Sequence, residues 1–226
     1  IISANSPSDC FDAVFAACRI AVEHMTPVFF LSDGYMANGS EPWKFPSTDS
    51  LPTIKVKQAK ERKEDDPTFL PYKRDERLVR DWALPGTKGL EHRIGGIEKE
   101  WDTGNISYDP ENHQRMVKVR AAKVAKIADS IPLQEIDNGS DNGDVLVLGW
   151  GSTYGVIKTA VKECIENGIS ASHVQVRYIE PFPKNLGDLL KRFKTVIIPE
   201  MNNGQLVKII RDKFLIDAKG INKIKG

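Results

Sequence analysis

A group of polar side chains follows a short apolar run late in the chain, within the segment from Thr195 to Ile210. The run 196–198 has the continuous apolar character of a buried strand, and Pro199 is expected to end it because proline cannot donate to a ladder. Carboxylate and amide groups beyond the carboxyl end of a parallel strand can bind a ligand or a neighbouring subunit. The residues with this chemistry are Glu200, Asn202, Asn203 and Gln205.

The next segment has a helical pattern. Its apolar residues follow the three-four spacing of one buried face: Leu206, Ile209, Ile210 and Phe214. Asn202 or Asn203 can cap the free amides at the start of this helix, and Gly204 lies between cap and helix. An alternative stays open, in which Glu200 and Gln205 are only solvated turn residues beside the cap.

The sequence GWGSTYG, at 149–155, also follows a predicted strand and begins a helix. A dinucleotide fingerprint requires its third glycine where Tyr154 stands, so the spacing argues against nucleotide binding. The alternative is a tight strand-to-helix turn in which Ser152 or Thr153 caps the helix, and an anion could bind at the helix end.

Other chemical groups are sparse. The four histidines show no metal-binding spacing, and no complete active site can be assembled, so we expect no catalytic, cofactor-binding or metal-binding residue in this chain. His92 follows Glu91 and could join a polar cluster with Glu98 or Asp102. Cys10, Cys18 and Cys164 are odd in number and form no CxxC pair, which favours a reducing, cytoplasmic location. Cys18 and Cys164 are expected on buried helix faces.

The predicted elements divide the chain into three parts. Residues 1–46 contain a helix whose stripe comprises Phe11, Val14, Phe15, Cys18 and Val22, followed by the strand at 27–31. Residues 47–142 form a connecting arm with a helix near 110–131, which Asp109 caps and which has an apolar seam at Val117, Ala121, Val124, Ala128 and Ile131. Residues 143–226 alternate strand and helix, including a strand from Val174 onward, and predict a parallel sheet.

The segment from Ser40 to Thr87 is rich in proline, glycine and charge, and we expect it to lie over another surface. The helix after it carries basic residues at Arg115, Lys118, Arg120, Lys123 and Lys126. This face could dock an acidic partner, or it could be the solvated side of an amphipathic helix.

Three segments resemble one protein family. EMNNGQL after VIIP, the segment GLEHRIGGIEKEWDTGNISYDPENHQRM at 89–116, and residues 6–43 are similar to alpha subunits of 2-oxoacid:ferredoxin oxidoreductases, especially the 2-oxoglutarate type. The resemblance implies an α/β fold, with the end of a thiamine-pyrimidine-type domain and a transketolase C-terminal-like parallel-sheet domain. It implies a C-terminal part of the subunit, clipped at both ends. Its candidate motif or interface residues are Glu91, His92, Glu200, Asn202, Gly204 and Gln205.

The family oxidatively decarboxylates a 2-oxoacid to acyl-CoA and passes electrons to ferredoxin. The resemblance therefore implies thiamine diphosphate, Mg and iron-sulfur clusters in the whole complex, mainly on a partner subunit, and none on this chain alone. It implies a beta subunit as partner, with ferredoxin and coenzyme A bound by the assembly. The family's carboxylate-binding Arg and the Glu facing the pyrimidine belong to motifs that do not occur here, so the chain alone is expected to be inactive.

Composition limits the other function classes. A net charge of +1 over 226 residues gives no bulk attraction for nucleic acid or an anionic membrane, and no apolar run is long enough to span a bilayer. Pyruvate or branched-chain 2-oxoacids remain alternative substrates, and a non-catalytic α/β interaction domain remains an alternative function.

Overall fold

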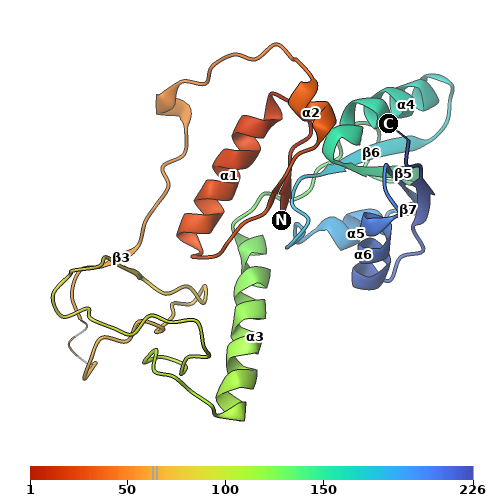
Figure 1. Cartoon of the computed structure of the whole chain (residues 1–226). Helices are drawn as coiled ribbons and strands as arrows, with labels where there is room; N and C mark the ends of the chain where they lie inside the picture. Colours follow the sequence, from red (N-terminus) through yellow and green to blue (C-terminus); the bar gives the residue numbers. More distant parts are fainter. Residues whose placement is uncertain (63, 65, 226) are drawn as a thin grey trace. The chain divides into compact units, whose positions relative to one another are not determined.

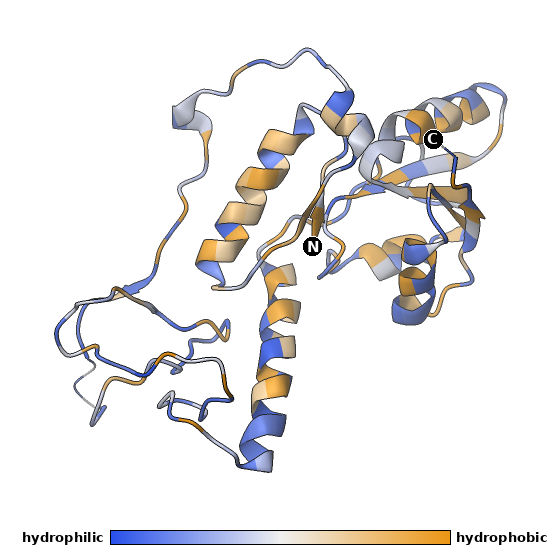
Figure 2. Cartoon of the chain, viewed as in Figure 1, coloured by the Kyte–Doolittle hydropathy of each residue, from blue (hydrophilic) through white to orange (hydrophobic). Residues whose placement is uncertain are grey.

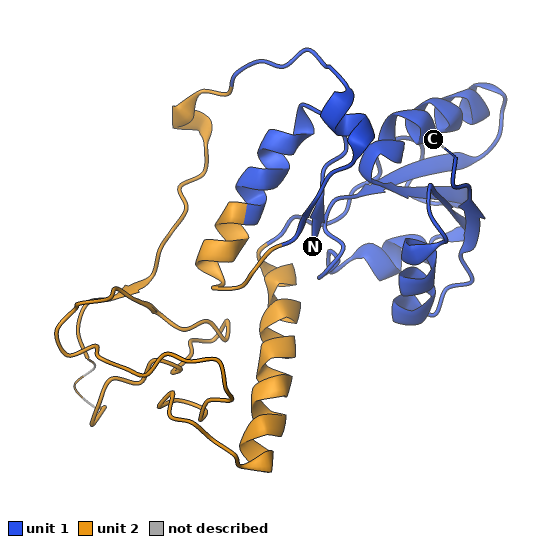
Figure 3. Cartoon of the chain, viewed as in Figure 1, with its two compact units in different colours: residues 1–17, 29–45, 131–226 blue, residues 18–28, 46–130 orange. Residues whose placement is uncertain are grey.

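The chain forms two compact units in a computed structural model that describes residues 1–62, 64 and 66–225. Unit 1 comprises Ile1–Ala17, Phe29–Phe45 and Ile131–Gly226, and unit 2 comprises Cys18–Val28 and Pro46–Ser130 (Figure 3). Each unit is therefore assembled from segments that are separated in the sequence.

A four-stranded sheet forms the centre of unit 1. The strands are β5 (Gly143–Trp150), β6 (Ala171–Val176), β7 (Phe193–Glu200) and β8 (Lys219–Asn222), and they lie in the order β6-β5-β7-β8 (Figure 1). All three strand pairs are parallel. The predicted alternation of strands and helices around a parallel sheet is confirmed.

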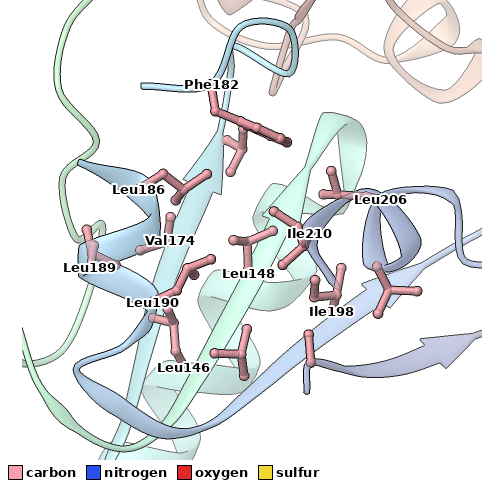
Figure 4. Packing of buried hydrophobic residues seen from close by; sticks show 14 of the residues in the cluster. Leu146, Leu148, Val174, Phe182, Leu186, Leu189, Leu190, Ile198, Leu206 and Ile210 are labelled. Carbon is pink, nitrogen blue, oxygen red and sulfur yellow. The ribbon is translucent and has the colours of Figure 1, made fainter. Parts of the chain in front are cut away.

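Three helices accompany this sheet: α4 (Tyr154–Glu166), α5 (Leu186–Leu190) and α6 (Gln205–Phe214), with the 3-10 turn η3 (Gly151–Thr153) before α4. Buried side chains of the strands meet those of α5 and α6 in one core, where Leu148, Ile198 and Ile210 are fully buried (Figure 4). A separate small cluster joins α4 to β6. Each such buried side chain contributes about 1.5–3 kcal/mol of transfer free energy.

Three predicted strand limits are wrong. The strand expected at 27–31 spans only Phe30–Leu31. β7 continues through Pro199 to Glu200, and Pro199 pairs with Ile221 of β8. Pairing of β7 with β5 ends at Ile197, so the missing proline amide interrupts no ladder on that side. The strand predicted from Val174 onward instead begins at Ala171 and ends at Val176, before the cis peptide bond between Glu180 and Pro181.

The first part of the chain adds short elements. β1 (Ile2–Ser3) and β2 (Phe30–Leu31) pair in parallel, α1 spans Asp9–Glu23, and α2 spans Gly34–Asn38. The predicted buried stripe of α1 is wrong at Val14, which is 41% exposed, and at Cys18, which is exposed. Its other members, Phe11, Phe15 and Val22, are half-buried. The buried residues of this helix are Ala13, Ala17 and Ile20, two of which are small. Figure 2 shows hydrophobic and hydrophilic residues mixed along this helix.

Unit 2 contains long irregular segments around one long helix. Its elements are η1 (Thr48–Ser50), β3 (Gln58–Ala59), β4 (Trp82–Ala83), α3 (Pro110–Lys126) and η2 (Ile127–Asp129), and β3 pairs with β4. Asp109 caps α3 through the amides of Glu111 and Asn112, as predicted. None of the helices that the structure describes is long and apolar enough to cross a bilayer.

The predicted apolar seam of α3 is confirmed only in its second half, where Val124 and Ala128 are half-buried and Ile131 is buried. Met116 and Ile127 are buried, whereas Val117 is 45% exposed and Ala121 is exposed. At the start of the helix the buried position is therefore Met116, one residue before the predicted Val117.

Candidate functional site

Glu200 lies at the end of β7 and is 3% exposed. Its Oε1 accepts hydrogen bonds from the Leu206 amide at 2.9 Å and from Trp150 Nε1 at 3.3 Å, and its Oε2 accepts one from the Val207 amide at 3.1 Å. The carboxylate thus lies at the positive end of the α6 dipole. The interpretation of Glu200 as a solvated turn residue is wrong; it is a buried helix cap that also holds the exit of β5.

Asn202 completes the turn. Its Nδ2 donates to Glu200 Oε1 at 3.1 Å, and its Oδ1 accepts from the amides of Gly204 at 2.8 Å and Gln205 at 3.0 Å. The predicted Asn cap is confirmed at Asn202. Gly204 has φ +76°, and a Cβ there would lie 2.7 Å from Asn222 Nδ2, so only glycine fits without strain. Gln205 is exposed and leaves its side-chain amide available to a partner.

The predicted stripe of α6 is partly confirmed. Leu206 and Ile210 are buried and Phe214 packs against the same core. Ile209 is 42% exposed, and Val207 lies in the core instead.

The glycines at the end of β5 and in the following turn allow close packing of the backbone. A Cβ on Gly149 would lie 2.5 Å from both Gln175 Oε1 and Ile157 Cδ1, and Gly151 has φ +62°. The predicted side-chain cap is wrong: Ser152 Oγ donates to Asp33 Oδ2, and Thr153 Oγ1 donates to the Trp150 carbonyl at 2.7 Å. The Asp33 carboxylate therefore lies near the start of α4.

The amino-terminal segment lies against the carboxyl end of β6. The Ser3 amide donates to the Arg177 carbonyl at 2.9 Å, and Ile2 bridges Tyr178. Gln175 Nε2 donates to Asn5 Oδ1 at 3.2 Å, and Arg177 forms an ion pair with Asp9. This edge of the sheet, where ligands commonly bind in open parallel sheets, is thus partly covered by the chain itself.

The second candidate region, around Glu91 and His92, lies in unit 2. His92 Nδ1 is 2.7 Å from the Leu90 carbonyl oxygen, and its ring lies 5.3 Å from that of Phe69. Glu91 is exposed, and hydrogen bonds from backbone amides lower the pKa of its carboxyl group. His92 is thus held by its own loop.

The predicted cluster of His92 with Glu98 or Asp102 is wrong. Glu98 instead meets His113 Nδ1 at 2.6 Å and Arg120 Nη1 at 3.3 Å. His113 and Arg120 lie seven residues apart on α3, two turns along one face, and this spacing could have indicated their shared partner. The hydrogen bond from His113 and the positive Arg120 lower the pKa of Glu98.

Cys164 and Cys18 differ in their exposure to solvent. Cys164 is half-buried and packs against the cluster between α4 and β6, as expected. Cys18 is exposed, which contradicts its predicted burial, because it lies on the outward side of α1.

Family comparisons cover most of the chain. The family model "Pyruvate flavodoxin/ferredoxin oxidoreductase, thiamine diphosphate-binding" matches residues 1–110, and "Pyruvate:ferredoxin oxidoreductase core domain II" matches residues 143–226. The 2-oxoglutarate oxidoreductase subunit KorA of Mycobacterium tuberculosis is 45% identical over 100% of this chain and 34% of its own length. The chain belongs to the family of 2-oxoacid:ferredoxin oxidoreductase alpha subunits.

Other members of this alpha-subunit family agree. The 2-oxoacid:ferredoxin oxidoreductase subunit alpha of Saccharolobus solfataricus is 28% identical over 93% of the chain and 34% of its own length. A solved 2-oxoglutarate:ferredoxin oxidoreductase from Magnetococcus marinus, with 2-oxoglutarate, coenzyme A and succinyl-CoA bound, matches 98% of this chain and 38% of its own chain. Its TM-score is 0.84 at 26% identity. The chain thus spans about a third of the length of these relatives.

The residues of this alpha-subunit chain do not fit a complete thiamine diphosphate site. Within the described ranges, no group of three or more His, Cys, Asp or Glu side chains could hold a metal ion. The carboxylates near the strand ends are engaged by the protein: Glu200 by the α6 amides, Asp9 by Arg177 and Asp33 by Ser152. No step of thiamine chemistry is therefore assigned to these side chains.

Proposed function

We propose that the chain is part of the alpha subunit of a 2-oxoglutarate:ferredoxin oxidoreductase. Such an enzyme oxidatively decarboxylates 2-oxoglutarate, forms succinyl-CoA from coenzyme A and passes the electrons to ferredoxin. The observation that carries this proposal is the 45% identity, over the whole chain, to a 2-oxoglutarate oxidoreductase subunit. The structural match to a solved 2-oxoglutarate:ferredoxin oxidoreductase with 2-oxoglutarate and coenzyme A bound supports the same substrate.

The cofactors belong to the assembly in this proposal. Thiamine diphosphate, when bound, supplies the electron sink for decarboxylation, and iron-sulfur clusters carry the electrons. We assign the Mg ion, the diphosphate contacts and the clusters mainly to a beta subunit, with coenzyme A and ferredoxin as partners of the whole complex. The three free cysteines support a cytoplasmic location.

The role proposed for this chain is support and subunit contact. Glu200, Asn202 and Gly204 fix the shape of the turn that presents Gln205, and Glu91 and His92 lie in the other candidate contact region. The proposed segments are residues 1–46 as the end of the pyrimidine-side domain, 47–142 as the arm, and 143–226 as the transketolase C-terminal-like domain.

A second candidate is oxidation of another 2-oxoacid. The relative from Saccharolobus solfataricus is described only by the class 2-oxoacid, so pyruvate or a branched-chain 2-oxoacid fits the same fold. A non-catalytic interaction domain is the alternative outside the enzyme class.

Purification of the native protein that contains this chain tests the proposal. A tag on it should recover a second subunit, together with thiamine, iron and acid-labile sulfide. A preparation that contains one kind of chain and neither thiamine nor iron would favour the interaction domain.

A further inference from the structure

A tight hairpin in unit 2 places two arginines opposite each other. Arg74 and Arg80 form an antiparallel bridge, and the Asp75 amide donates to the Val79 carbonyl at 2.9 Å. Asp75 Oδ1 also accepts from the Val79 amide at 2.9 Å, and Leu78 closes the turn with φ +63°. Like charges directly opposite each other on paired strands are destabilising. The hairpin therefore holds two positive groups together at a cost in stability.

Aromatic rings alternate with the arginines. The Arg80 guanidinium lies 4.6 Å from the Tyr72 ring centroid, and Arg74 lies 5.7 Å from Tyr72 and 4.9 Å from Trp101. Arg115 of α3 lies 3.3 Å from the Trp101 ring centroid. The rings hold the cations in a row by cation–π attraction, but they carry no net charge.

Among the described residues, no carboxylate forms an ion pair with Arg74 or Arg80. Arg74 donates to the carbonyls of Tyr72 and Trp101, and Arg80 has no hydrogen bond or ion pair within the part of the chain that the structure describes. Lys123 of α3 donates to the Met25 carbonyl at 2.9 Å. Burial lowers the pKa of Arg74 and of Lys123, and the nearby Arg80 lowers both further.

The acids closest in sequence are already occupied. Asp81, next to Arg80, pairs with Lys57 at 2.9 Å, and Asp75, next to Arg74, pairs with Lys57 at 3.4 Å and Arg77 at 3.6 Å. Half-buried cations without a counter-charge are unfavourable unless an external anion compensates them.

We propose that Arg74, Arg80 and Lys123, the cationic cluster, form a docking site for an acidic segment of another protein chain. A single phosphate binds donors that converge on one point, whereas Arg74 and Lys123 donate to separate backbone carbonyls and Arg80 lies over the Tyr72 ring. In an extended acidic segment, carboxylates on one side repeat every ~6.6 Å, which suits a row of separated cations. Charge complementarity therefore favours a peptide over a phosphate.

Binding of a fluorescein-labelled hexaglutamate peptide to the chain, followed by fluorescence anisotropy at low salt, tests this docking site. Arg80→Gln should weaken binding at least tenfold, and added salt should weaken wild-type binding. The matched control is Lys88→Gln, an exposed lysine of the same unit with the same change in charge, which should alter the Kd less than twofold. No wild-type binding, or equal losses in both variants, would overturn the proposal.

Two further readouts separate docking from other roles. Arg80→Gln should leave the Tm unchanged or raise it, because it removes a repelled charge that makes no hydrogen bond or ion pair within the described part of the chain; a lower Tm would show that the cluster is a structural bracket. Inorganic phosphate that displaces the peptide at equal concentration would show a single-anion site and overturn the peptide proposal.

Discussion

Glu200 is a buried acidic side chain that accepts hydrogen bonds from two amides of α6, from the Trp150 indole and from the Asn202 side chain. The family resemblance identified its motif, and the Asn cap followed from local rules. Its burial could not be predicted, because it depends on Trp150, which lies fifty positions earlier and reaches Glu200 only through the pairing of β5 with β7.

Replacement of Glu200 tests this cap. Glu200→Ala leaves the Leu206 and Val207 amides and the Trp150 indole without their acceptor, so we expect a loss of about 3 kcal/mol in the free energy of unfolding. Urea denaturation measures it. Gln205→Ala is the control and should change stability by less than about 0.5 kcal/mol, because Gln205 is exposed. Similar values for the two variants would contradict the assigned cap.

The buried His24 should make the stability of the fold depend on pH. Its Nε2 lies 2.9 Å from Ser130 Oγ, and burial, followed by the positive Arg77, lowers its pKa below the ordinary 6.5. The unfolded chain therefore takes up this proton at higher pH than the folded chain. The stability contributed by neutral His24 is fully present above about pH 6.5 and is lost as the pH falls through the folded-state pKa.

Urea midpoints at several values between about pH 8 and about pH 5 measure this effect. His24→Gln should flatten the decline in part, because His173, whose pKa burial also lowers, still contributes. An unchanged slope in His24→Gln would show that another group causes the decline.

Among the elements, the sheet was the most predictable and the helix faces were the least. Strands can be predicted from short apolar runs, and helix starts from aspartate and proline, because these signals lie within a few neighbouring residues of the sequence. In α1, apolar residues cover more than one side, and the pattern alone could not show that Ala13 and Ala17 face inward while Val14 faces out. The β1–β2 pair was missed because its strands have two residues each.

The turn between β5 and α4 gives a matched glycine pair. Gly149→Ala would place a Cβ 2.5 Å from Gln175 Oε1 and Ile157 Cδ1, so we expect about 1–3 kcal/mol of destabilisation. Gly155→Ala meets no atom within 4 Å on α4 and should stabilise by up to about 1 kcal/mol. Thermal unfolding of both variants distinguishes close approach from general glycine flexibility; equal shifts would refute the close approach.

For the whole molecule, the sequence motifs predicted the α/β architecture and the family, and the comparisons confirm both. The division into two compact units was not predicted, because it joins the amino-terminal segment to the carboxyl-terminal sheet through contacts such as Ser3 with Arg177. These contacts bring together residues more than 170 positions apart, which no local pattern reports.

The most direct test of the proposed function is viologen reduction by the native complex, purified through a tag on the protein that contains this chain. We predict reduction that requires both 2-oxoglutarate and coenzyme A, with far lower rates for pyruvate and branched-chain 2-oxoacids. Turnover with pyruvate alone would contradict the proposed substrate, and no turnover with any 2-oxoacid, in a preparation that retains thiamine and iron, would contradict the enzyme assignment.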